Sequence, residues 1–230
     1  MKKLYLLSVA YILANIIQAQ NVTAEWVRHT GDAGTDLARG MNIDLDGNIY
    51  ITGSFEGGMD IDPSPDYHYL SASGTSDAFI SKYNRDGILV WGRSVGGDGV
   101  DQGLACTIDT SGNVYTIGIY EGTADFDPGP GVVNLTGTAG DLDVFISKLD
   151  SNGNYVWAKK LGGSGGDQLG WSIALDNQGN IYSVGSFAGT CDFKPGTGTY
   201  NLTRRERYLH FSIKCRRQLC MGKKIWRHTK

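Results

Sequence analysis

The sequence predicts an all-β fold built from short antiparallel strands. Gly accounts for 33 of the 230 residues and Pro for only 5, so many positions suit tight turns. Apolar segments such as 48–52 and 144–148 are rich in β-branched side chains and are bounded by Gly, Asp and Asn. No segment carries an apolar stripe of helical spacing with caps. The 40% apolar content excludes a disordered chain, and the length allows one or two globular domains.

A period of about 65 residues organises these strands. Trp26, Trp91 and Trp157 stand 65 and 66 residues apart. The words that recur with them are I-D-L-D-G-N-I-Y-I-T-G at 43–53, with copies at 108–118 and 175–185; D-A-F-I-S-K-Y at 77–83, with a copy at 143–149; and D-x-D-P at 60–63, with copies at 125–128 and 192–195. Each complete period holds about four strand candidates separated by turns.

Four antiparallel strands repeated radially describe a blade of a β-propeller. We therefore expect residues 20–203 to form an incomplete β-propeller of four-stranded antiparallel blades, with two complete blades and part of a third. A right-handed β-solenoid is the alternative, but its rungs are usually shorter than this period. The segment around Trp26 resembles a strand that closes a blade begun elsewhere. An open arc exposes blade edges, which predicts aggregation, or pairing with missing blades or another chain.

Two motifs resemble the secreted bacterial β-propeller repeats of the SBBP type. They are D-x-x-G-N-x-Y-x-x-G, and F-I-S-K followed by G-N-x-V-W. The resemblance covers roughly residues 24–203. It implies a blade fold and an extracellular or cell-surface setting, and it supplies no catalytic signature.

The N-terminal segment, residues 1–19, predicts a secretory signal peptide. It begins with Lys2 and Lys3, continues with an apolar stretch over 4–17 and ends at the small residue Ala19. The apolar stretch is shorter than the ~20 residues that cross a bilayer, and Asn15 interrupts it. We therefore expect a secreted or cell-surface protein without a membrane span.

The C-terminal segment, residues 204–230, is basic and lies outside the repeat. It carries a net charge of +9, whereas residues 1–203 carry −12. Charge alone would suggest nucleic acid or an anionic surface. A frameshift explains the segment better, because reading its codons one base later turns Met221-Gly222 into a Trp codon, 64 codons after Trp157. We therefore expect a truncated fragment without a nucleic-acid partner, and DNA sequencing tests this hypothesis.

The D-G-N turns are the first candidate metal sites. Asp44, Asp46 and Asn48 alternate as oxygen ligands do in calcium loops. The competing interpretation is a hairpin turn in which Gly47 takes positive φ and the polar side chains bind the backbone. Gln178 replaces Asp46 in the third copy and no distal Glu follows. These departures favour the turn and leave calcium open.

The D-x-D-P words place two carboxylates close together, Asp60 with Asp62 and Asp125 with Asp127. Such pairs prefer a cation or a shared proton. Lys194 takes the second position in the third copy, so the favoured interpretation is an exposed loop stiffened by Pro.

Catalytic side chains are few. His29 and His68 occupy non-equivalent positions, and no nucleophile motif surrounds them. We therefore assign no catalytic, cofactor-binding or metal-binding residue. Cys106 and Cys191 occupy apolar positions of the repeat and are expected to be small fillers, with a disulfide left open.

We expect an exported, non-enzymatic module for binding or adhesion whose partner is a glycan or a cell-surface protein. Tyr67, Tyr69 and Tyr120 are candidate glycan contacts on loops, whereas Trp91 and Trp157 are expected to pack between blades. The enzyme alternative is a propeller-based hydrolase or lyase that acts on extracellular polysaccharide through acidic residues. A structural spacer is the third alternative.

Overall fold

The chain is all-β wherever its structure is described. The structure, a computed structural model, describes the backbone of residues 24–194, 198–216 and 219–221, and side chains as far as Thr203. This part contains sixteen strands, in antiparallel pairs, and no helix, hence no helix that could cross a membrane. The all-β prediction is confirmed for these residues. The expected signal peptide (1–19) and the side chains of 204–230 lie outside the described residues.

The first repeat forms a four-stranded sheet, here called unit 1, in which each strand pairs with the next. Its main strands are β1 (Leu37–Ile43), β2 (Ile49–Phe55), β5 (Asp77–Tyr83) and β6 (Leu89–Gly97). A short hairpin of β3 (Gly58–Asp60) and β4 (Tyr69–Ser71) is inserted between the second and third strands.

The second repeat, unit 2, has the same plan. Its main strands are β7 (Gln102–Ile108), β8 (Val114–Glu121), β11 (Leu142–Leu149) and β12 (Tyr155–Ser164), and its hairpin is β9 (Thr123–Asp125) with β10 (Asn134–Thr136). The repeated words therefore produce repeated sheets, strand by strand.

The third repeat, unit 3, contains β13 (Gln168–Leu175), β14 (Asn180–Asp192), β15 (Asn201–Arg216) and β16 (Leu219–Met221). Here the inserted hairpin is continuous with the main strands, because the end of β14 pairs with the start of β15. Strand pairing continues beyond Thr203, where the sequence repeat ends.

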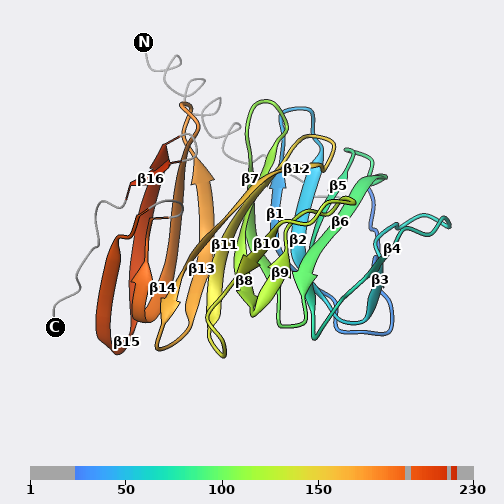
Figure 1. The fold of residues 1–230 in the computed structure, drawn as a ribbon. Coiled ribbons are helices and arrows are strands. Elements are labelled where there is room, and N and C mark those ends of the chain that lie inside the picture. The colour runs from blue at the N-terminus through green and yellow to red at the C-terminus, as the bar shows by residue number, and fades with distance from the viewer. Residues whose placement is uncertain (1–23, 195–197, 217–218, 222–230) are drawn as a thin grey trace, which may run out of the picture.

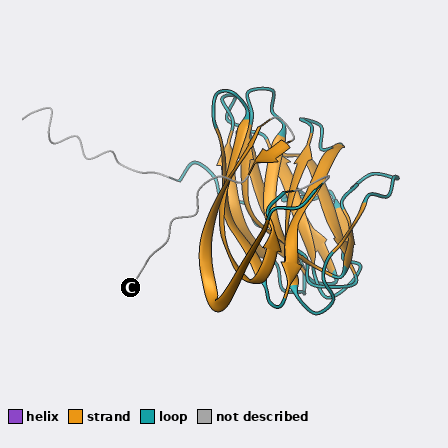
Figure 2. Ribbon diagram, turned by 60° about the vertical axis from the view of Figure 1, so that its left-hand side comes forward, coloured by secondary structure: helices purple, strands orange, loops and turns teal. Residues whose placement is uncertain are grey.

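The units stand side by side in chain order (Figure 1), and loops gather at both ends of the strands (Figure 2). The end of β6 pairs with β9 of unit 2, and the end of β12 pairs with β14 of unit 3. The first strands of the three units, β1, β7 and β13, are also neighbours in sequence order. Each unit is therefore hydrogen-bonded to the next.

The hydrophobic core lies between the units. On β11, Val144 and Ile146 pack toward unit 3, whereas Phe145 and Leu149 pack toward unit 1. Successive side chains of a strand point to opposite faces, so a strand between two neighbours must be apolar on both. This explains why V-F-I at 144–146 is a continuous apolar run instead of an alternating one.

Candidate functional site

Each D-x-x-G-N turn folds around its first Asp. In unit 1, Asp44 Oδ1 accepts hydrogen bonds from the backbone N–H of Asp46 (3.0 Å) and Asn48 (2.8 Å), and its Oδ2 accepts one from the Asn48 amide (2.8 Å). Gly47 has φ +83°, which glycine adopts without strain. The same turn recurs at Asp109, Asp150 and Asp176. A calcium ion at Asp44 would have to displace these N–H donors.

Electrostatics reinforce the turns. Burial alone would raise the pKa of Asp109, but hydrogen bonds from Asn113 and Ser111 and the Lys148 ammonium together hold that pKa below its ordinary value. Lys148 Nζ lies 3.3 Å from Asp109 Oδ2 and donates to the Tyr115 hydroxyl at 2.7 Å. The turn of unit 2 is thus fixed by a Lys–Tyr–Asp network.

A groove of about 490 Å³ lies between the turns of units 1 and 2. Its lining combines carboxylates, hydroxyls, one ammonium and apolar side chains: Asn42, Ile43, Asp44, Leu45, Asp46, Asn48, Lys82, Ile108, Asp109, Thr110, Ser111, Gly112 and Ser151. Leu45 is 96% exposed. The Lys82 ammonium lies 5.1 Å from the centre of the Tyr50 ring. Such a lining offers hydrogen bonds together with an apolar contact to a polar ligand.

The D-x-D-P carboxylates close the loops of the inserted hairpins. Asp60 Oδ1 accepts from the backbone N–H of Asp62 and of His68, both at 3.1 Å. Asp125 makes the equivalent bonds in unit 2, at 3.0 and 2.8 Å. The structure also brings His29 beside Asp60 and Asp62 in a second groove of about 360 Å³. Among the described residues, no three His, Cys, Asp or Glu side chains gather as metal ligands.

Trp91 connects unit 1 to unit 2, as the sequence predicts. Its ring is 6% exposed, and its Nε1 donates to the Ser151 carbonyl at 3.0 Å. Trp26 lies on unit 1 in the same way, donating to the Arg85 carbonyl at 3.3 Å, but it is 39% exposed. The hydrogen bond recurs while the burial differs.

The prediction for Tyr120 is wrong. Tyr67 and Tyr69 are exposed, but Tyr120 lies at the end of β8, fully buried and edge-to-face on Phe126 at 5.6 Å. It takes the strand position of Phe55 in unit 1, where only the apolar body of the side chain is needed. It therefore cannot contact a glycan.

The two cysteines fill apolar positions, and the prediction of small fillers is confirmed. Cys106 and Cys191 are buried free thiols. Burial raises the pKa of the Cys106 thiol to about 12, so it is a poor nucleophile in the folded protein.

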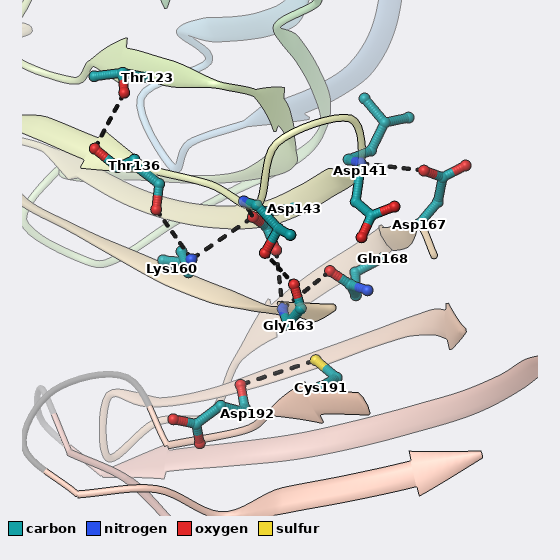
Figure 3. A network of polar contacts seen from close by, with 12 residues as sticks. Thr123, Thr136, Asp141, Asp143, Lys160, Gly163, Asp167, Gln168, Cys191 and Asp192 are labelled. Carbon is teal, nitrogen blue, oxygen red and sulfur yellow. Dashed lines mark hydrogen bonds and ion pairs between the residues drawn. The ribbon is translucent and has the colours of Figure 1, made fainter. Parts of the chain in front are cut away.

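Three buried acids were not predicted from the sequence: Asp77, Asp101 and Asp143. Asp143 lies 3.6 Å from Lys160 Nζ and accepts from the Gly163 N–H at 3.0 Å, beside Gln168 (Figure 3). For Asp77 and Asp143, the available signal was the Asp two residues before each F-I-S-K word, because an Asp at the start of a doubly buried strand has little access to water.

The comparisons with known proteins find distant relatives. No family model matches the chain. It is 30% identical over 118 residues to an uncharacterized WD repeat-containing protein, L264, of Acanthamoeba polyphaga mimivirus, a match covering 44% of this chain and 8% of that protein. It is 26% identical over 144 residues to the regulatory protein FlaEY of Caulobacter vibrioides, covering 61% and 14%.

These matches span only a small part of each relative. The resemblance to a WD repeat-containing protein agrees with a protein made of repeated four-stranded units, which is how WD repeats are built. The finer resemblance to SBBP repeats stays a prediction.

Proposed function

We propose that the repeated units are blades of a β-propeller, and that the protein is an exported, non-enzymatic binding module for a glycan or a cell-surface protein. Three observations support the blade proposal. The main strands of units 1 and 2 pair in chain order, each unit is hydrogen-bonded to the next at a contact here called a joint, and the first strands β1, β7 and β13 are neighbours. Export is supported by the sequence of residues 1–19.

The observation that carries the binding proposal is the groove between the turns of units 1 and 2. Asp44 and Asp109 are occupied in holding their turns, which fixes the backbone around the groove. Leu45, 96% exposed on the groove wall, has no role in the core. A rigid rim with an exposed apolar side chain suits ligand binding.

A glycan array and a surface-protein binding screen of the full chain test the proposal. Leu45→Ser should weaken binding by about tenfold, as loss of one apolar contact does. Val132→Ser is the matched control, because Val132 is 70% exposed on the β9–β10 loop, outside the groove. Equal losses in both variants would remove the groove from the binding site.

The enzyme alternative predicts a different result. Turnover of a polysaccharide that is lost on substitution of Asp125 and Asp127 would replace the binding module with a hydrolase or lyase. Because Asp125 accepts two backbone N–H bonds, the variants must first be shown to fold by circular dichroism.

A further inference from the structure

The joint between units 1 and 2 holds a pair of buried carboxylates. Asp77 begins β5 and Asp101 immediately precedes β7, and the two side chains are 3% and 1% exposed. A Cβ atom placed on Gly96 would lie 2.5 Å from Asp77 Oδ1 and 3.0 Å from Asp101 Oδ2. The two oxygens flank one point and are therefore within 5.5 Å of each other.

Neither carboxylate is fully satisfied. Asp77 Oδ2 accepts from the Ser73 N–H at 3.2 Å, and Asp101 Oδ2 accepts from the Gly97 N–H at 2.7 Å. Oδ1 of each is buried without a hydrogen-bond partner. The ion pairs among the described residues involve neither side chain. Two unbalanced charges this close together and shielded from water would be strongly unfavourable.

At the joint between units 2 and 3, other residues balance the charge of the buried carboxylate. Asp143 replaces Asp77, and Gln168 replaces Asp101, its Oε1 accepting from the Gly163 N–H at 3.2 Å as Asp101 accepts from Gly97. Lys160 stands where unit 1 has Ser94 and lies 3.6 Å from Asp143 (Figure 3). The second joint is therefore neutralised by a cation, and the first is not.

We propose that Asp77 and Asp101 share a proton, which makes the joint between units 1 and 2 a pH-sensitive contact. The protonated carboxyl donates its O–H to the other carboxylate, so that one negative charge is left across the pair. Loss of this proton to solvent leaves two carboxylates in the joint and favours separation of the units.

The surroundings support a proton over a cation. The charged or titratable groups facing Asp101 are Asp77, Glu121 and the Tyr120 phenol, none of which is a cation. Burial is the main cause that raises the pKa of Asp77 to about 6 and of Asp101 to about 7. A calcium ion asks for six to eight oxygen ligands, whereas only two carboxylates meet here.

The sign of the pH effect follows from these shifts. Both carboxyls have folded-state pKa values above the ordinary value of 3.8, so the folded protein holds protons that the unfolded chain releases. The stabilisation is complete below about pH 4 and is lost as the pH rises through about 6 to 7.

Thermal unfolding of the full chain between about pH 5 and about pH 8 tests the proposal. The melting temperature of the wild type should fall by about 5–10 °C over this range. Asp101→Gln copies the second joint and should reduce this fall, because it removes one of the two titrating carboxyls, and Ser94→Lys should also reduce it by adding a cation. Asp86→Asn is the matched control, because its side chain is 70% exposed, and it should keep the wild-type slope.

Infrared difference spectra of the wild type give a readout independent of stability. They should show a protonated-carboxyl band that disappears on titration through neutral pH and is weaker in Asp101→Gln. An unchanged slope in folded Asp101→Gln or Ser94→Lys, or the absence of this band, would overturn the proposal. So would a stabilisation by about 1 mM Ca²⁺ that abolishes the slope of the wild type, which would assign the pair to a cation.

Discussion

Replacing Trp91 with Ala should strongly weaken the joint between units 1 and 2. The ring is 6% exposed, packs edge-to-face on Tyr50 at 6.2 Å and donates to the Ser151 carbonyl at 3.0 Å. Truncating a buried Trp costs about 3–5 kcal/mol of unfolding free energy. Of this, the ring pair accounts for roughly 0.5–1.5 kcal/mol and the hydrogen bond for about 1 kcal/mol.

Trp26 provides the matched comparison, because it makes the same kind of bond to a turn carbonyl while 39% exposed. Trp26→Ala should therefore cost only about 1–2 kcal/mol, in proportion to the apolar area that it buries. Urea unfolding followed by circular dichroism measures both variants, with equal slopes against urea required for the comparison. Equal costs for the two variants, or a cost below about 1 kcal/mol for Trp91→Ala, would refute the burial argument.

Three further predictions concern the turns and strands. Gly118→Ala should lower the free energy of unfolding by about 2 kcal/mol or more, because the added Cβ would clash with the Gln102 carbonyl between β7 and β8. Gly122→Ala should lower it by only about 1 kcal/mol, because the space around Gly122 is open and only its φ of +69° opposes a side chain. Urea unfolding measures both variants. The pKa of Asp176, held at about 2 chiefly by the hydrogen bond from the Asn180 amide, should rise toward its ordinary value in Asn180→Ala, measured by NMR titration. Iodoacetamide should alkylate Cys106 in urea but not in the native protein, measured by peptide mass mapping, and rapid native labelling would contradict its burial.

The strands and turns could be predicted from the sequence because their causes are local. Gly47 and Asp44 specify a turn within five residues, and the copies of this word fixed the spacing of the strands between them. The expected packing of Trp91 against the next unit followed from its place at the end of each period, where a strand meets its neighbour.

The buried acids could not be predicted in the same way. Asp101 and Gln168 can be aligned from the sequence, because each lies seven residues before the recurring word at 108–118 or 175–185. That they lie beside Asp77 and Asp143 follows only from how the units pack. Tyr120 was misplaced for a related reason, since its loop-like neighbours conceal that it ends a doubly covered strand. Side-chain packing between units decides both cases, and a single period does not contain it.

The last strand of each unit packs against the next unit along the chain. This arrangement also affects how such a chain can gain or lose repeats. Trp91 lies on the turn after Asp150, one unit further along the chain, so the structural border is offset from the border of the sequence period. A recombination event that adds one whole period, cut at any phase, therefore duplicates a complete joint along with the strands. Later substitutions can then give each joint its own chemistry, as Asp101 and Gln168 do.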